Sequence, residues 1–249
     1  MEHQATSKTN HESSNGTSNG TQEHNTEVPE QPAVDETASL LWRLCHGTEK
    51  ATLTFAGQGV IDLDAFVDDF VDNEIIRETF LSGSACLEAL ALDPEARWSG
   101  YVSQGMNIAQ WLSVPETRPE QTYLSSCVVS QPLILLCQIA LYRDLYARGL
   151  KKAWNEGAID SAVGHSQGIL PALLIAESPN GDICLERLND YLRYAFWQGI
   201  AMATSYEESG HALRDGDATP MAAVSGMDIR TLSAFVDGVN KQLPPTSAM

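Results

Sequence analysis

Five consecutive residues, Gly164-His165-Ser166-Gln167-Gly168, have the types and the spacing best suited to covalent chemistry in this sequence. The pattern is G-x-S-x-G, typical of a nucleophile elbow, in which a serine occupies a sharp turn between a strand and a helix. A backbone N–H at the start of that helix can point at an oxyanion as it develops. The pattern predicts Ser166 as a nucleophile. The competing interpretation is a plain glycine-flanked turn with a buried serine.

The segments on either side of the motif have the composition that such a turn requires. Residues 158–163 form a short apolar stretch that predicts a strand, and residues 169–177 are rich in Ala, Leu and Ile and predict a helix. Pro171 lies inside that helix, where its ring would crowd the carbonyl of Gln167 and could cost about 3 kcal/mol. We therefore expect a kinked helix and a distorted elbow.

A second glycine-containing segment follows an earlier strand. Residues 51–56 are half β-branched or aromatic and predict a strand that continues into Gly57-Gln58-Gly59. Such a tripeptide suits a tight loop whose backbone amides approach a ligand. An ordinary turn is the alternative.

The remaining segments predict a largely helical chain. Helix-start signals at Ser130 and Pro132 predict the most clearly marked helix of the chain. A break near Asn73 or at 82–84 divides the acidic stretch 64–92 into two helices. Further helices are expected at 39–45, 105–112, 185–203 and 228–239, a polar loop at 207–220 and a strand at 221–224.

Composition excludes several classes of function. The net charge of −18 argues against nucleic acid as a partner, because a phosphate-binding surface needs basic residues. No run of about 18 apolar residues predicts a membrane span, and the polar N-terminus lacks the apolar core of a signal peptide, so we expect a cytoplasmic location. The five cysteines are scattered and show no C-x-x-C spacing, so we expect neither a metal site nor disulfides.

Six stretches together resemble one family, the acetyltransferase domain near the start of the β subunit of fungal type I fatty-acid synthases. Short-chain synthases that supply polyketide starter units belong to the same group. The stretches occur in the family's order and spacing and are residues 55–59, 104–112, 123–134, 164–169, 196–199 and 220–226.

The resemblance implies an α/β fold, with an α/β-hydrolase-like large subdomain and an inserted ferredoxin-like small subdomain. Residues 38–219 would be the N-terminal part of the large subdomain, which would be incomplete. Residues 220–249 would be the start of the small subdomain, cut short. Residues 1–37 are polar with almost no large apolar side chain, and we expect them to be disordered.

The resemblance also implies a reaction and a site. Ser166 would take an acyl group from a coenzyme A thioester and pass it to the phosphopantetheine thiol of acyl carrier protein, with no permanently bound cofactor. The backbone amides of Gln58 and Gln167 would form the oxyanion hole. Malonyl-selective relatives carry an arginine at the position of Gln198, so an acetyl or short saturated acyl group is favoured here. The implied protein partners are acyl carrier protein, the synthase α subunit and the rest of the β subunit.

The general base is the missing part of the predicted site. The family's histidine would lie beyond residue 249, and the weaker candidates in this sequence are His165, His211 and His46. We therefore expect this chain alone to be inactive. Two alternatives stay open: a catalytically dead piece that acts in binding or as a scaffold, and an α/β-hydrolase esterase. Against the esterase, no HGGG-type oxyanion loop is present.

Overall fold

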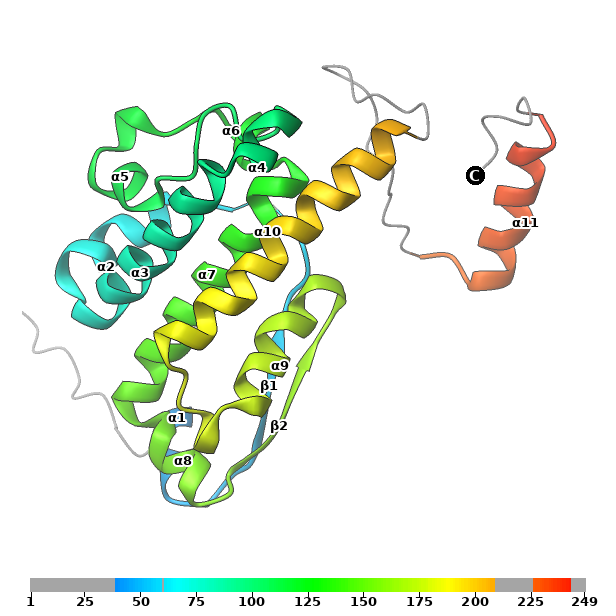
Figure 1. Ribbon diagram of the computed structural model, residues 1–249. Helices are drawn as coiled ribbons and strands as arrows, with labels where there is room; N and C mark the ends of the chain where they lie inside the picture. Colours follow the sequence, from blue (N-terminus) through cyan, green and yellow to red (C-terminus); the bar gives the residue numbers. More distant parts are fainter. Residues whose placement is uncertain (1–38, 60, 209–225, 243–249) are drawn as a thin grey trace, which may run out of the picture.

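A computed structural model describes residues 39–59, 61–208 and 226–242 (Figure 1). Its two strands, β1 (Ala51–Phe55) and β2 (Ile159–Gly164), pair in parallel, with Thr52 opposite Ser161 and Phe55 opposite Gly164. A parallel pair needs a long crossover, and here the crossover carries most of the helices. The described part is mostly helical and is compatible with the predicted α/β class.

The central helix is α7 (Cys127–Leu145), which packs against α3 (Glu74–Ala91) and α10 (Leu185–Glu208) (Figure 1). The prediction that this helix begins at Ser130 was wrong: it begins at Cys127, after an extended Ser126, and Pro132 lies inside it. A proline within a helix costs about 3 kcal/mol. Burial on nearly every side offsets that cost, since the side chains beyond Pro132 include four with no exposed surface: Leu133, Leu135, Leu136 and Ile139.

This helix qualifies the expectation that no segment is apolar enough to span a membrane. The helical stretch Cys127–Asn155 is long and apolar enough, by length and composition, to cross a membrane. However, 78% of its most apolar window is buried inside the structure, which is typical of a core helix.

Helix α3 begins where the sequence predicted a break. The side chain of Asn73 accepts hydrogen bonds from the N–H groups of Ile75 and Ile76, at 3.0 and 3.2 Å, which satisfies two donors of the first turn. The alternative break at 82–84 does not occur. A Cβ on Gly83 would lie 2.5 Å from the Leu136 side chain, so this glycine instead lets α3 approach α7 closely.

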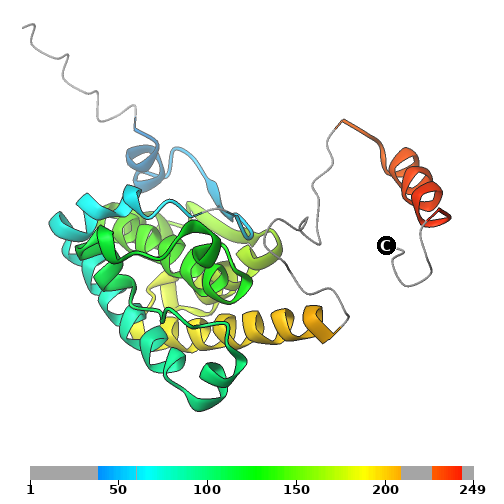
Figure 2. The ribbon, with the colours of Figure 1, turned by 90° about the horizontal axis from the view of Figure 1, so that it is seen from above.

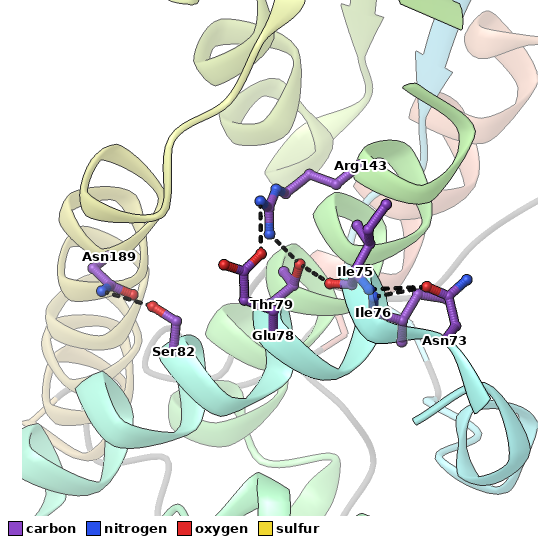
Figure 3. Close-up of polar contacts among 8 residues, drawn as sticks. All are labelled: Asn73, Ile75, Ile76, Glu78, Thr79, Ser82, Arg143 and Asn189. Atoms are coloured by element: carbon purple, nitrogen blue, oxygen red, sulfur yellow. Dashed lines mark hydrogen bonds and ion pairs between the residues drawn. The ribbon is translucent and has the colours of Figure 1, made fainter. Parts of the chain in front are cut away.

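Polar contacts fix α3 against both of its long neighbours (Figure 3). Arg143 of α7 donates to the hydroxyl of Thr79 at 2.6 Å and to the carboxylate of Glu78 at 3.1 Å. Asn189 of α10 donates to the Ser82 hydroxyl at 3.2 Å. Thr79 has no exposed surface, so the Arg143 contact is a charge-assisted bond to a buried group and sets the register of α3 on α7.

The shorter helices complete the described fold. Helix α9 (Ile169–Glu177) contacts both strands and α10 runs along one side of the helical layer (Figure 2). The predicted helices at 39–45, 169–177 and 228–239 are confirmed. The helix predicted at 105–112 begins only at Ile108. The helix predicted at 185–203 continues to Glu208, so residues 207 and 208 are helical and do not begin a loop. The predicted disordered tail, the strand at 221–224 and most of the loop at 207–220 lie outside the described residues.

The other helices are α1 (Leu40–Cys45), α2 (Val67–Asp72), α4 (Pro94–Ser99), α5 (Ile108–Ser113), α6 (Gln121–Leu124), α8 (Lys151–Asn155) and α11 (Ile229–Asn240), with short turns η2 (Asp64–Phe66), η3 (Pro115–Thr117), η4 (Tyr146–Leu150), η5 (Ser166–Gly168) and η6 (Pro179–Gly181).

Candidate functional site

Ser166 occupies a sharp turn between a strand and a helix. Strand β2 ends at Gly164, the 3-10 turn η5 covers Ser166–Gly168, and α9 begins at Ile169. Ser166 has a φ of +53°, in the left-handed region that a residue with a Cβ rarely occupies. Holding it there costs about 1–3 kcal/mol, and such strain persists where surrounding contacts impose it. The side chain is exposed, as a nucleophile that meets a substrate requires.

The two glycines of the motif are required by close backbone contacts. A Cβ on Gly164 would lie 2.0 Å from the carbonyl oxygen of Gly168, and a Cβ on Gly168 would lie 2.3 Å from the carbonyl oxygen of Phe55. Real Cβ contacts are never this short. The turn therefore closes on itself and on the end of β1, which accounts for the strained serine between the glycines.

The kink expected from Pro171 is not found in α9. The helix runs without a break from Ile169 to Glu177. Pro171 falls in its first turn, where a backbone N–H has no partner inside the helix, so the proline removes no helical bond there.

The Gly57-Gln58-Gly59 loop lies directly against the elbow. A Cβ on Gly57 would be 3.0 Å from the Ser166 Cβ and 2.9 Å from the His165 carbonyl oxygen. The amide of Gln138, on α7, donates to the Ala56 carbonyl at 2.9 Å and holds the start of the loop. Two glycine-containing segments far apart in the sequence thus meet beside the serine.

The side chains of Gln58 and Gln167 are both bound to one turn of α7. The Gln58 amide donates to the Ser130 hydroxyl at 2.8 Å, and the Gln167 amide donates to the backbone carbonyl of Gln131. Ser130 and Gln131 are buried. Sequence patterns assigned this Ser-Gln pair only to a helix start. The signal that could have identified them is two polar residues within an apolar run, because buried polar groups need partners.

Gln198 lies on α10 near the same turn. A Cβ on the next residue, Gly199, would be 2.8 Å from the Val128 Cα, so α10 touches α7 here. One helical turn beyond Gln198, the Met202 sulfur lies 3.1 Å from the amide nitrogen of Gln131. Among the described residues, no side chain forms a hydrogen bond with Gln198, whose side chain is half-buried.

The described ranges contain two of the candidate histidines. His46 caps α1, its Nδ1 lies 2.8 Å from the Trp42 carbonyl, and it precedes β1. Ser166 follows β2, and because the strands are parallel, the two side chains lie at opposite ends of the sheet. His165 is exposed beside the elbow, and among the hydrogen bonds of the described residues none joins it to Ser166. His211 lies outside those ranges.

A known protein family matches the part of the chain that contains the elbow. The family model described as "Starter unit:ACP transacylase in aflatoxin biosynthesis" matches residues 53–249, a range that includes Gln58, the elbow and Gln198. The fatty acid synthase beta subunit aflB of Emericella nidulans is 30% identical over 220 residues, 84% of this chain.

Two other fatty acid synthase beta subunits match this chain to a similar extent. The fatty acid synthase subunit beta of Aspergillus oryzae is 27% identical over 77% of this chain, and the beta subunit hexB of Dothistroma septosporum is 28% identical over 83%. The chain spans only 10%, 10% and 12% of the lengths of these three relatives.

Proposed function

The chain belongs to the starter unit:ACP transacylase family, and on that premise we propose that it moves an acyl group from a coenzyme A thioester to acyl carrier protein through an ester of Ser166. The resemblance to the acyltransferase domain of fungal fatty-acid synthase β subunits is confirmed. The observation that carries the proposal is the left-handed Ser166 on a strand–turn–helix elbow, with the Gln58 loop packed against it.

The first half of the proposed reaction acylates the serine. The Ser166 hydroxyl attacks the thioester carbonyl and gives its proton to a general base, and the carbonyl oxygen becomes an oxyanion. The backbone N–H groups of Gln58 and Gln167 donate to that oxygen, and one such donor is typically worth about 10²–10³ in rate. When the intermediate collapses, the C–S bond breaks and the coenzyme A thiolate takes up the proton.

The second half reverses these steps with a different thiol. The phosphopantetheine thiol of acyl carrier protein loses its proton to the base and attacks the seryl ester. The C–O bond then breaks and Ser166 recovers its proton. We assign the base to a residue outside the described ranges, because His46 lies at the other end of the sheet and His165 makes no hydrogen bond with Ser166 within them.

Substrate choice is part of the proposal. A bidentate arginine is the usual partner for a free carboxylate, whereas Gln198 carries no charge. An uncharged acetyl or short saturated acyl group therefore fits this position better than a malonyl group. The proposed partners are acyl carrier protein and the α subunit and remaining β-subunit domains of a synthase.

We also propose how the chain divides into subdomains. A parallel strand pair with a helical crossover and a nucleophile elbow supports an α/β-hydrolase-like large subdomain over residues 38–219. Residues 220–249 would then open the ferredoxin-like small subdomain.

A product assay tests the proposal. A form of the protein that contains the general base is incubated with acetyl-CoA and phosphopantetheinylated acyl carrier protein, and acetylated carrier and free acetate are both measured. We expect acetylated carrier to exceed acetate, and Ser166→Ala to abolish its formation. Acetate without acetylated carrier would favour an esterase. Carrier binding without transfer would favour a scaffold, and either result would contradict the proposal.

A further inference from the structure

We propose that Ser130 and Gln131 are positioning residues that hold the two oxyanion-hole segments at a fixed separation. They are consecutive on α7 and bind the side chains of Gln58 and Gln167, respectively. The inference rests on the proposed function, because it assigns a task to residues that do not themselves touch the reacting atoms.

The two oxyanion donors come from separate segments. Gln58 follows β1 and Gln167 follows β2, and each has to present its backbone N–H to the same oxygen. An oxyanion hole works when its donors are fixed before the reaction, and a misplacement of about 1 Å can cost up to about 10²-fold in rate. Both glutamines are anchored to adjacent residues of one helix, which gives the two segments a common reference.

Helix α7 is a suitable reference because it is rigidly packed. Ser130 has no exposed surface, and Gln131 is 4% exposed. By contrast, the Ser166 side chain that the hole serves is exposed. The segments that meet substrate are thus tied to a part of the molecule that substrate does not reach.

The two anchors differ in kind. Ser130 acts through its hydroxyl, which accepts from the Gln58 amide at 2.8 Å. Gln131 acts through its backbone carbonyl, whose second lone pair can accept from Gln167 in addition to any helical bond. Its side-chain nitrogen is occupied elsewhere, 3.1 Å from both the Cys127 and Met202 sulfurs.

The unpartnered atoms of this cluster support the same arrangement. The side-chain oxygens of Gln131 and Gln167 are buried, and no hydrogen-bond partner for either lies among the described residues. Each amide is therefore held by its NH₂ end alone. The Gln167 side chain consequently depends on the Gln131 carbonyl for its position.

Side-chain substitutions can test this without removing the oxyanion donors. Gln58 and Gln167 contribute backbone N–H groups, so Gln58→Met and Gln167→Met keep the donor and remove the anchor. Ser130→Ala removes the anchor from the other side, and Ser130→Thr keeps a hydroxyl. The matched control is Ser84→Ala, since Ser84 is 3% exposed and accepts from the Ala109 N–H at 3.0 Å, but lies on α3.

The experiment measures kcat and KM for acetyl transfer in the complete protein, together with thermal unfolding. We expect Ser130→Ala, Gln58→Met and Gln167→Met each to lower kcat roughly tenfold with KM for acetyl-CoA unchanged, because oxyanion stabilisation acts in the transition state. The double variant Ser130→Ala/Gln58→Met should lose no more than either single variant, since both remove the same bond. Ser130→Thr should restore most of kcat, and Ser84→Ala should lower the melting temperature without lowering kcat.

Two outcomes would overturn the inference while leaving the proposed function intact. One is a wild-type kcat in Ser130→Ala and Gln58→Met. The other is a loss of kcat that is proportional to the loss of folded protein in each variant and that adds up in the double variant. A bond that only stabilises the fold would give this result. If the unsubstituted protein contains the general base and still transfers no acetyl group, that result would instead contradict the proposed function itself.

Discussion

Gly168 lies so close to Phe55 that a Cβ on the glycine would be 2.3 Å from the Phe55 carbonyl oxygen. The same carbonyl accepts the backbone N–H of His165 at 3.1 Å. The end of β1 and the elbow after β2 are therefore joined by backbone contacts on both sides of Ser166. Through these contacts, the loop that carries Gln58 is brought beside the serine.

Replacing this glycine tests the contact. In Gly168→Ala, the added methyl group has to displace β1 or the elbow. We therefore expect the free energy of unfolding to fall by about 1–3 kcal/mol, and we expect acyl transfer to be lost as well. Gly238→Ala is the control, since a Cβ there would meet no atom within 4 Å. Thermal unfolding and the acetyl-transfer assay measure both effects. Unchanged stability and activity in Gly168→Ala would show that the contact is not tight.

A second prediction concerns acyl selectivity at position 198. In Gln198→Arg, the introduced guanidinium can pair with the carboxylate of a malonyl group, and such a charge-assisted contact is worth about 1.5–3 kcal/mol. We therefore expect kcat/KM for malonyl-CoA to rise about tenfold or more relative to acetyl-CoA. Gln198→Met, which adds no charge, should leave the ratio near its starting value. Equal loading of acetyl-CoA and malonyl-CoA by the unsubstituted protein would contradict the role of Gln198 in acyl selectivity.

The third prediction is a loss of stability at alkaline pH. Burial raises the pKa of Tyr123 to about 12, and its hydroxyl donates to the Gly105 carbonyl at 2.8 Å. Because an unfolded tyrosine ionises near pH 10, the unfolded chain loses its proton first. The contribution of Tyr123 is thus complete below about pH 10 and declines as the pH rises towards 12.

Urea unfolding between pH 8 and pH 12 measures that decline. Tyr123→Phe cannot ionise, so its free energy of unfolding should fall less steeply over this range. The variant should also be less stable by about 1 kcal/mol at neutral pH, because one hydrogen bond is lost. The same slope in both proteins would contradict the prediction.

Thiol labelling gives a fourth prediction, which tests the packing of α7. Cys137 is 7% exposed, and burial raises its pKa to about 12, whereas Cys184 is exposed. A thiolate-selective reagent at neutral pH should modify Cys184 in the native protein and Cys137 only after unfolding. Peptide mass spectrometry measures the order, and modification of Cys137 in the native protein would contradict the packing described for α7.

Local patterns predicted those elements whose signals lie within a few residues. The elbow, α9 and the Asn73 break were all predictable, since a turn glycine and a capping side chain act on their own backbone. The start of α7 was not, because Ser130 and Pro132 resemble a helix start until burial on all sides is known. The expected effect of Pro171 likewise depended on where α9 begins, which a shift of a few residues decides.

The candidate site was predictable only in part. The motif predicted Ser166, and the resemblance to a family implied Gln58, Gln167 and Gln198. Neither indicated that Ser130 and Gln131 bind the side chains of Gln58 and Gln167, because those contacts join segments distant in the sequence. Spacing along the chain says nothing about such contacts unless the tertiary fold is known.

The most direct test of the account is to identify the residue that carries the acyl group. The protein, in a form that contains the general base, is incubated with isotopically labelled acetyl-CoA, quenched in acid and digested, and the modified peptide is located by mass spectrometry. The account predicts one labelled ester on Ser166, absent in Ser166→Ala and discharged when phosphopantetheinylated acyl carrier protein is added before the quench. Label on another residue, or label retained in Ser166→Ala, would contradict it.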